Sequence, residues 1–501
     1  MKVNAANELL YSISKDDRSK IAIYSSQGHY SYSQYIEEVN KYQEVLIRIY
    51  GKRNIRIGII MDDCVEFIFL FWACLKIGIV PILINNKFTL ETIGKSINSI
   101  GLKNILIKKN DKIKHDLLEN RFAEIATYNQ IHFLQKKEYS YKKESLLEKE
   151  IAFGIFTSGT TNVPKCVMHT HVSMIRCVNS YYKNMIGIRK NDIIYSASKM
   201  MHTYGLGNTV FQTVGVRAAS IVCDEGSVYS IIENIQKYRP TVLFAVPTVY
   251  KELIRIKQNE NIELSSLRMC FSAGEHLDKS IYKEFYLKFG CEILDGMGNT
   301  EYLTTFITNT LKDHKVGSCG KSIPGFEAKI VNDKNIELSN GKVGRLLVKG
   351  NIHFLRYYGN NKKVSSEDYF DTENLCYKDD DGFIWYVGRK SILYKIRGRW
   401  VNPIEIEQIL NQMDEIEETL VVKDSIQGLD DSTLYIKIKE DLNRDIEKDA
   451  VIHKIKVILK RNLEHYKCPT KFVFVKHIPK GATGKKIRKK IGKEYYLGDQ
   501  L

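Results

Sequence analysis

Along the first 350 residues, short apolar runs alternate with longer stretches in which apolar residues recur at helical spacing. This alternation is typical of parallel strands joined by helices that cover both faces of a sheet. The expected strands lie at 55–61, 80–84, 104–107, 151–156, 219–222 and 241–245.

The pattern changes further along the chain. Runs at 328–331 and 343–349 flank the turn dipeptide Asn340-Gly341, which predicts a hairpin, and a run at 383–387 follows a turn at 379–382. After Gly388-Arg389 a compact α+β region is expected, with helices at 403–412 and 449–463 and strands at 419–422, 433–438 and 471–475. We therefore predict a large α/β N-terminal domain, residues 1–389, with parallel-rich sheets, helices on both faces and a small β-rich subdomain. A smaller, mobile α+β domain, residues 390–501, follows it.

The most apolar stretch, residues 65–84, is interrupted by Glu66, Lys76, Gly78 and Pro81. A membrane span needs about 20 residues with few such interruptions, so a buried helix at 66–76 followed by a buried strand at 80–84 is expected instead. The first residues lack the apolar core of a signal peptide, and the ten cysteines include no C-x-x-C pair. We expect a cytoplasmic protein with reduced thiols, without a membrane span.

The formal net charge is +16, with 75 Lys and Arg against 59 Asp and Glu. Nucleic-acid binding is one interpretation, but the lysines are spread widely and no known nucleic-acid-binding motif is present. Only residues 467–501 are strongly basic, with ten Lys and Arg against two acids. A solvated basic surface is the simpler interpretation. The same field would suit a phosphorylated small molecule or an acidic carrier protein.

Residues 155–165, Ile-Phe-Thr-Ser-Gly-Thr-Thr-Asn-Val-Pro-Lys, join an apolar strand to a hydroxyl-rich loop that ends in a lysine. Backbone N–H groups, hydroxyls and an ammonium group can all donate to phosphate oxygens. The segment does not match the P-loop pattern, and a flexible Ser/Thr/Gly loop is the alternative.

Four segments in this order resemble the adenylate-forming superfamily of acyl- and aryl-CoA ligases, luciferases and adenylation domains. They are the loop at 156–165, Gly-Met-Gly-Asn-Thr-Glu at 296–301, the hinge region at 388–407, and Pro-Lys-Gly-Ala-Thr-Gly-Lys at 479–485. Tyr-Gly-Leu-Gly-Asn at 204–208, Ser-Ala-Gly-Glu at 272–275 and Leu-Asp-Gly-Met-Gly at 294–298 look most similar to benzoate-type aryl-CoA ligases. The neighbourhood of Tyr204 has no carboxylate to pair with a substrate ammonium group, which disfavours amino acids as substrates.

The resemblance implies roles for individual residues. Thr300 would bond the α-phosphate, Glu301 would hold Mg²⁺, and Lys485 would bridge the substrate carboxylate and the α-phosphate as the mobile catalytic lysine. Lys485 lies in a basic run, which is more often a solvated tail. The implied β/γ-phosphate ligands are Thr157, Ser158, Gly159, Thr160, Thr161 and Lys165, and the residues around the adenine are Gly274, Glu275, His276, Asp295, Gly296 and Met297.

The other implied positions are the ribose and hinge residues and the acid pocket. Arg389 would contact the ribose or a phosphate, Lys395 belongs to the hinge motif, and Gly398 would let the pantetheine arm pass close to the backbone. The alternative for Arg389 is an ordinary strand-end arginine, and that for Gly398 is a turn glycine between two strands. His202 and Tyr204 could be a helix cap and a core tyrosine. The implied pocket residues are His202, Thr203, Tyr204, Gly205, Ala273, Gly298 and Leu303.

Several positions depart from the family pattern. Thr372-Glu373-Asn374 stands where the family has Thr-Gly-Asp, so Asn374 replaces the aspartate that grips the ribose. That contact would weaken by about 1–2 kcal/mol, because an amide offers fewer acceptors than a carboxylate. Ser391-Ile392 replaces the acidic pair at the hinge, and Met297 replaces the tyrosine that stacks on adenine.

The sequence therefore favours an ATP- and Mg²⁺-dependent ligase that adenylates a hydrophobic, aromatic acid and transfers it to coenzyme A. One alternative is a stand-alone enzyme that loads the phosphopantetheine of an acidic carrier protein. A second is a non-catalytic relative. The expected assembly is a monomer or a homodimer, without nucleic acid.

Overall fold

The computed structural model describes residues 3–51, 55–108, 122–128, 131–136, 150–157, 164–223, 225–257, 262–360, 363–410, 413–426, 429–439, 447–479, 486, 488 and 491–492. The chain divides into two compact units. Unit 1 comprises Met1–Lys329, Leu347–Phe370 and Lys378–Trp385, and unit 2 comprises Ile330–Leu346, Asp371–Tyr377 and Tyr386–Leu501.

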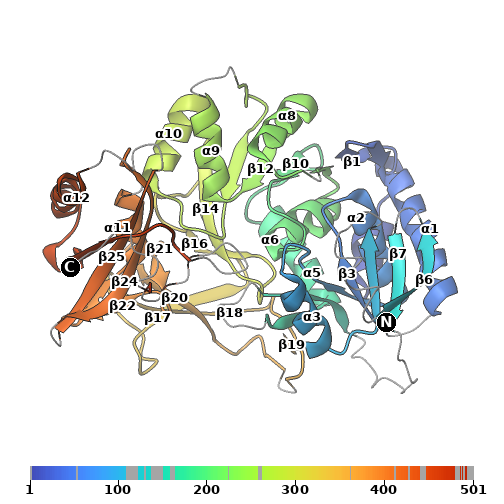
Figure 1. Ribbon diagram of the computed structural model, residues 1–501. Helices are drawn as coiled ribbons and strands as arrows, with labels where there is room; N and C mark the ends of the chain where they lie inside the picture. The colour runs from blue at the N-terminus through green and yellow to red at the C-terminus, as the bar shows by residue number, and fades with distance from the viewer. Residues whose placement is uncertain are drawn as a thin grey trace. The chain divides into compact units, whose positions relative to one another are not determined.

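Unit 1 contains a nine-stranded sheet in the order β16-β15-β14-β13-β12-β10-β11-β1-β2 (Figure 1). The six strands from β14 to β1 are parallel, and antiparallel strands close both edges. The strands are β1 (Ile21–Ser25), β2 (Gly28–Ser31), β10 (Ile193–Ser196), β11 (Ala219–Val222), β12 (Val242–Ala245), β13 (Met269–Ser272), β14 (Ile293–Gly298), β15 (Thr305–Thr308) and β16 (Lys321–Ser322).

A second sheet of unit 1 has eight strands in the order β19-β9-β8-β4-β3-β5-β7-β6. Its centre, from β8 to β5, is parallel, while β9, β19, β7 and β6 are antiparallel additions. The strands are β3 (Arg56–Ile60), β4 (Val80–Leu83), β5 (Asn104–Lys108), β6 (Phe122–Tyr128), β7 (Ile131–Lys136), β8 (Ile151–Phe156), β9 (Cys166–Thr170) and β19 (Arg356–Tyr357).

Helices cover both faces of the nine-stranded sheet, as the strand–helix alternation predicts. On one face, α8 (Val228–Tyr238), α9 (Pro247–Lys257) and α10 (Lys279–Phe289) lie side by side over β10, β12 and β14 (Figure 1). On the other face, side chains of β12, β13 and β14 share a core with α2 (Val65–Ile77), α5 (His171–Cys177) and η3 (Val178–Lys183). The remaining helical segments of unit 1 are η1 (Ala6–Tyr11), η2 (Lys15–Asp17), α1 (Tyr32–Tyr50), α3 (Leu90–Ser99), α6 (Thr203–Leu206), η4 (Gly207–Phe211) and α7 (Gln212–Val216).

The stretch that could have been mistaken for a membrane segment forms α2 and β4. Every residue of α2 from Val65 to Leu75 except Glu66 is buried, which explains why the helix is apolar on every side. Gly78 ends α2 in the left-handed conformation at φ +78°, and its N–H bonds to the last turn. Within the described residues, no helix is long and apolar enough to cross a membrane.

Unit 2 is the smaller α+β region that the sequence predicts. Its three-stranded sheet has the order β24-β25-β26, and α11 and α12 pack together beside it. A short hairpin precedes α11. The elements are β22 (Tyr394–Ile396), β23 (Arg399–Val401), α11 (Pro403–Leu410), β24 (Ile416–Ile426), β25 (Leu429–Ile438), α12 (Lys448–Asn462), η6 (His465–Lys467) and β26 (Lys471–Phe474).

A further sheet has the order β17-β18-β20-β21, with β17 (Phe326–Val331), β18 (Gly344–Gly350), β20 (Phe370–Lys378) and β21 (Ile384–Arg389). β17 and β18 are neighbours, as the expected hairpin requires, and Gly341 lies between them at φ +77°. This sheet corresponds to the small β-rich subdomain expected from the sequence. The prediction of a boundary between residues 389 and 390 remains a prediction, and the earlier segments that belong to unit 2 were not foreseen.

Candidate active site

The candidate site of unit 1 lies at the carboxyl ends of parallel strands, where the loops that follow them meet. β13 and β14 are adjacent and parallel, and Ser272 is the register partner of Asp295. Residues Ala273 to His276 follow β13 directly. The expected adenine residues on these two segments are therefore brought together.

Asp295 and Ser272 are neighbouring buried polar residues on adjacent strands. Asp295 Oδ1 and Ser272 Oγ are both buried, and neither has a hydrogen-bond partner among the described residues. Burial raises the pKa of Asp295 well above its usual value. A buried acceptor without a partner costs free energy, so this position fits a ligand group that donates a hydrogen bond, such as the amino group of adenine.

Hydrogen bonds from Asn309 hold the backbone of Asp295 in place. The Asn309 N–H and the Asn309 Nδ2 donate to the Asp295 carbonyl oxygen at 2.9 Å and 3.0 Å. Asn309 Nδ2 also donates to Ser318 O, and Asn309 Oδ1 accepts from the N–H of Lys315 at 3.0 Å. The Asp295 backbone is thus tied to the loop that carries Lys315.

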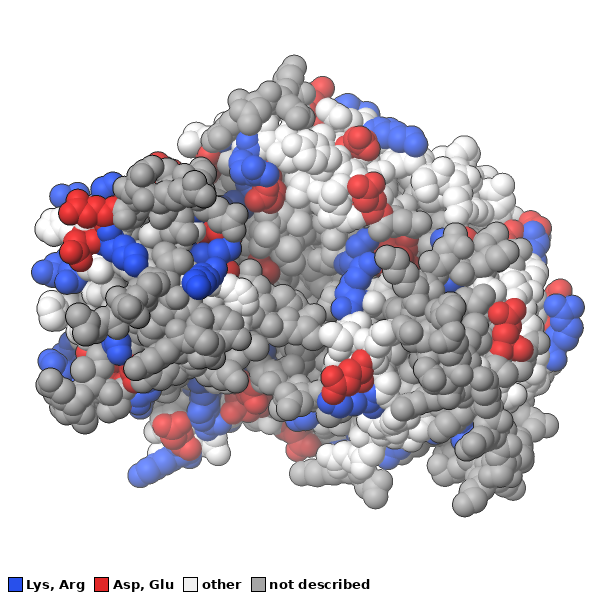
Figure 2. All heavy atoms as spheres, in the orientation of Figure 1, with Lys and Arg blue, Asp and Glu red and all other residues white. Residues whose placement is uncertain are grey.

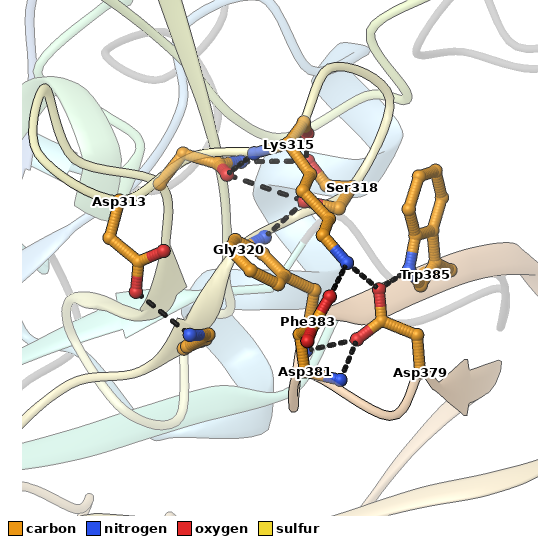
Figure 3. A network of polar contacts seen from close by, with 10 residues as sticks. Asp313, Lys315, Ser318, Gly320, Asp379, Asp381, Phe383 and Trp385 are labelled. Carbon is orange, nitrogen blue, oxygen red and sulfur yellow. Dashed lines mark hydrogen bonds and ion pairs between the residues drawn. The ribbon is translucent and has the colours of Figure 1, made fainter. Parts of the chain in front are cut away.

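The same loop is anchored to the turn between β20 and β21 (Figure 3). Lys315 Nζ bonds to Asp379 Oδ2 at 2.8 Å and also contacts Asp381, and Trp385 Nε1 donates to Asp379 at 3.0 Å. Burial acts against the charge on Asp379, but hydrogen bonds from Lys315 and Trp385 prevail and lower its pKa to about 2. Asp379 therefore stays charged and holds the loop.

The other expected adenine residues differ in how far they are exposed. Glu275 is exposed, and its Oε2 accepts from Thr248 Oγ1 at 2.9 Å. Burial lowers the pKa of His276. Gly274 has φ +86°, a conformation that favours glycine, and Met297 is buried in β14.

Two glycines of β14 allow close approach of the backbone. A Cβ on Gly296 would lie 2.6 Å from Thr305 Cγ2, and one on Gly298 would lie 2.7 Å from the carbonyl oxygen of Thr304. Leu303 follows at φ +62° although it is buried and not glycine. Such left-handed residues cluster at functional sites, where the surroundings hold them in place.

Thr300 is held by a histidine from the other sheet. His169 of β9 is fully buried, and its Nε2 donates to the carbonyl oxygen of Thr300 at 2.9 Å. Burial lowers the pKa of His169 to about 3, so the ring is neutral and its Nε2 carries the proton. His171 is also buried and accepts from the N–H of Ala5 at 3.2 Å.

Glu301 is held by two contacts from the segment around β19. Its backbone oxygen accepts from the N–H of Phe354 at 2.7 Å, and its Oε1 accepts from the hydroxyl of Tyr357 at 2.8 Å. Lys165 Nζ lies 5.3 Å from the centroid of the same Tyr357 ring. Lys165, Thr300 and Glu301, predicted separately from two motifs, are thus joined through β9 and β19.

The hydroxyl-rich loop is closed at its base. The N–H of Thr157 donates to the Lys165 carbonyl oxygen at 2.9 Å, and β8 pairs with β9 up to Phe156 and Cys166. The predicted phosphate ligands Ser158, Gly159, Thr160 and Thr161 lie outside the described residues, so their roles remain predictions.

Four of the expected acid-pocket residues, His202, Thr203, Tyr204 and Gly205, lie at the start of α6. Tyr204 donates from its hydroxyl to the Phe271 carbonyl oxygen at 3.3 Å, and its ring meets Phe244 edge-on at 5.9 Å. Burial raises the pKa of Tyr204 well above its usual value. His202 is the exposed N-cap residue of α6, and Thr203 is the first residue of the helix.

Gly205 and Ala273 complete the described part of this region. A Cβ on Gly205 would lie 2.1 Å from the backbone oxygen of Lys199, so only glycine fits there. Ala273 is buried immediately after β13. Tyr204 bonds to Phe271, two residues before Ala273, and the assignment of both to one pocket stays a prediction.

In unit 2, the expected ribose residues lie on neighbouring strands. Asn374 is on β20 and Arg389 ends β21, and the N–H of Lys390 donates to the Glu373 carbonyl oxygen at 2.8 Å. Arg389 Nη2 is 3.5 Å from Glu373 Oε2. A carboxylate is thus present beside Arg389, although it comes from the residue before Asn374.

Lys395 and Gly398 belong to the β22–β23 hairpin. Lys395 Nζ lies 4.6 Å from the ring centroid of Trp400, its cross-strand partner. Arg397 and Gly398 form the two-residue turn at φ +49° and +77°. The turn-glycine interpretation of Gly398 is confirmed, and its role toward a pantetheine arm stays a prediction.

The predicted catalytic lysine, Lys485, lies outside the described residues. Its neighbour Lys486 donates to Glu407 Oε2 at 3.3 Å and to the Thr419 carbonyl oxygen, and Arg488 donates to both carboxylate oxygens of Glu407 at 2.6 Å and 3.0 Å. Glu407 is only 3% exposed and also accepts from the N–H of Val421. Lys486 and Arg488 are therefore ion-paired to a buried carboxylate and are not part of a solvated basic tail.

Tyr357 and His169 are not among the site residues expected from the sequence. No local pattern marks either residue, because their importance comes from contacts with Thr300 and Glu301 more than 50 positions away.

Comparison with known proteins identifies the family. The AMP-binding enzyme family model matches residues 12–358, and that of the AMP-binding enzyme C-terminal domain matches residues 405–485. The chain belongs to the AMP-binding enzyme family.

Individual relatives align over nearly their full length. A 4-hydroxybenzoate–CoA/benzoate–CoA ligase of Rhodopseudomonas palustris is 28% identical over 496 residues, which cover 96% of this chain and 91% of the relative. A benzoate–CoA ligase of Thauera aromatica is 26% identical over 515 residues, covering 98% and 96%. The crystal structure of a benzoate CoA ligase from Burkholderia xenovorans LB400 superposes with a TM-score of 0.77 at 25% identity, covering 97% and 99%.

Proposed function

We propose that this chain is an ATP-dependent, AMP-forming ligase that activates an aromatic carboxylic acid and transfers the acyl group to coenzyme A. Family membership and the near full-length similarity to benzoate- and hydroxybenzoate–CoA ligases support the reaction class. The observation that carries the proposal is the convergence of Lys165, Thr300 and Glu301 at one place in unit 1.

The reaction has two displacements. A carboxylate oxygen of the acid attacks the α-phosphorus of ATP and pyrophosphate leaves. The thiol of coenzyme A then loses its proton and attacks the acyl carbonyl, and AMP leaves. The first step brings several negative charges together, so it needs cations and hydrogen-bond donors more than it needs a base.

Described residues of the chain can supply these groups. Lys165 places an ammonium group at the base of the hydroxyl-rich loop, and Thr300 places a hydroxyl at the end of β14. Glu301 supplies a carboxylate for Mg²⁺, which binds proteins through one or two carboxylates and otherwise through substrate phosphates and water. The bound ion would neutralise phosphate charge. Asp295 offers the acceptor for the amino group of adenine.

We further propose that residues 390–501 act as a mobile lid and that Lys485 bridges the carboxylate and the α-phosphate. Lys486, the residue that follows Lys485, and Arg488 are both ion-paired with the buried Glu407. Lys485→Ala should slow pyrophosphate release at least about 100-fold, because the developing charge loses a positioned cation. The exposed Lys476 is the matched control, and Lys476→Ala should leave the rate unchanged.

The decisive experiment measures pyrophosphate release with ATP and Mg²⁺ across benzoate- and cinnamate-like acids, and then compares acceptors. Acylation of coenzyme A is expected. Preferential acylation of a carrier protein's phosphopantetheine would replace the proposed acceptor, and the absence of pyrophosphate release with every acid would favour a non-catalytic relative.

A further inference from the structure

Tyr357 lies between a cation and an anion of the candidate site. Its hydroxyl donates to Glu301 Oε1 at 2.8 Å, and its ring centroid is 5.3 Å from Lys165 Nζ. The ring of Phe354 packs against it with centroids 4.8 Å apart. One aromatic side chain therefore contacts residues from both predicted phosphate-binding motifs.

The backbone of Tyr357 is fixed relative to Lys165. In β19, Tyr357 is the antiparallel partner of Val167, two residues after Lys165. The N–H of Leu355 donates to Met168 O at 2.7 Å, and the N–H of Tyr358 donates to Cys166 O at 2.8 Å. The two flanking bonds prevent β19 from sliding along β9, so the ring stays beside the lysine.

The same segment holds the backbone of Glu301. The N–H of Phe354 donates to the Glu301 carbonyl oxygen at 2.7 Å. Glu301 is thus bound at its main chain by one residue of this segment and at its carboxylate by another. The hydroxyl of Tyr357 selects one orientation of the carboxylate, and ordering it before the ligand binds reduces the entropy lost on binding.

We propose that Tyr357 is a positioning residue that couples the metal-binding carboxylate of Glu301 to the phosphate-binding ammonium group of Lys165. The inference rests on the proposed function. The hydroxyl makes a charge-assisted bond to the carboxylate, while the ring face attracts the ammonium group without neutralising it. Both groups can then act on one Mg²⁺-bound polyphosphate.

The test is calorimetric titration of ATP into the full chain, with Mg²⁺ and with EDTA. In the wild type, Mg²⁺ should tighten ATP binding. Tyr357→Phe keeps the ring and removes the hydroxyl. The factor by which Mg²⁺ tightens ATP binding should therefore be about tenfold smaller in this variant, while the affinity for ATP without Mg²⁺ is unchanged. Tyr358→Phe is the adjacent control, because the Tyr358 ring packs on Arg56 and lies outside the proposed site.

A second variant tests the contact with Lys165. Tyr357→Leu removes the ring as well, so it should also weaken ATP binding in EDTA by about threefold. Equal behaviour of the leucine and phenylalanine variants would refute the coupling to Lys165. If Mg²⁺ tightened ATP binding by the same factor in Tyr357→Phe as in the wild type, the coupling to Glu301 would be refuted.

These outcomes are distinct from failure of the proposed function. If the wild type bound no ATP, the function and this inference would both be wrong. If it bound Mg²⁺–ATP and released pyrophosphate, while Tyr357→Phe matched the wild type in both media, only the inference would be wrong.

Discussion

At the scale of single residues, Asp295 offers a test of nucleotide recognition. Its Oδ1 is buried without a partner among the described residues, so it suits the amino group of adenine better than the carbonyl of guanine. Asp295→Asn introduces a donor at this position. The ratio of kcat/KM for ATP to that for GTP should fall about tenfold, measured by pyrophosphate release.

Asp278→Asn is the matched control for Asp295→Asn. Asp278 caps α10 through Ser280, and asparagine caps helices equally well. The nucleotide ratio should therefore stay at the wild-type value in this variant. An unchanged ratio in Asp295→Asn as well would remove Asp295 from the adenine site.

His169 predicts how stability depends on pH. Burial lowers the pKa of His169 to about 3, whereas a free histidine titrates near ~6.5. Between these values the unfolded chain binds a proton that the folded chain does not, so the free energy of unfolding falls as the pH falls. The loss approaches about 1.4 kcal/mol per pH unit for this one group.

His169→Gln should therefore reduce the loss of stability between pH 7 and pH 5, because glutamine can still donate to Thr300 O but does not titrate. The unfolding temperature at the two pH values measures this loss. Replacing the exposed His29 by glutamine should leave the difference as in the wild type. The same difference in all three proteins would contradict the assignment.

At the scale of elements, the start of α6 depends on a glycine. A Cβ on Gly205 would lie 2.1 Å from Lys199 O, whereas a Cβ on Gly94, inside α3, would meet nothing within 4 Å. Gly205→Ala should destabilise unit 1 by about 3 kcal/mol, because the backbone at Lys199 must move to make room for the added methyl group. Gly94→Ala should stabilise it by about 0.5–1 kcal/mol, because alanine favours the helix.

Unfolding temperature and the KM for the acid test this pair of variants. Gly205→Ala should lower the unfolding temperature and raise the KM for the acid, since Tyr204 would shift with the helix. An alanine variant at 205 as stable as the one at 94 would show that the Lys199 carbonyl can move aside at little cost.

Elements with strong local patterns were predicted well. β8 and β11 begin and end at the predicted residues, and α2 and α12 lie within one residue of the expected bounds. β10, β13 and β14 were missed, although β13 and β14 carry site residues. Polar residues such as Ser272 and Asp295 shorten or interrupt their apolar pattern, although both side chains are buried.

At the scale of the whole molecule, the net charge of +16 bears on the acceptor. On the face shown in Figure 2, basic and acidic side chains are interspersed among the described residues. A net positive field attracts the phosphates of coenzyme A over distances near the Debye length, about 8 Å at physiological salt.

Raising the salt concentration should therefore increase the KM for coenzyme A several-fold, because salt screens the attraction between the positively charged protein and the phosphates. Pantetheine carries no phosphate, so its KM as the alternative thiol acceptor should change little. Initial-rate measurements with both thiols decide the point, and parallel salt dependence would show that the field does not act on the phosphates.

The sequence by itself determined the class of fold, the family and the bounds of the elements with the strongest local patterns. Periodicity and turn chemistry act within a few residues, and the family motifs are contiguous. Only the tertiary structure showed that His169 holds Thr300, that Tyr357 joins Glu301 to Lys165, and that Glu407 binds Lys486 and Arg488. Those contacts depend on strand order and on burial, which bring together side chains that are distant along the chain.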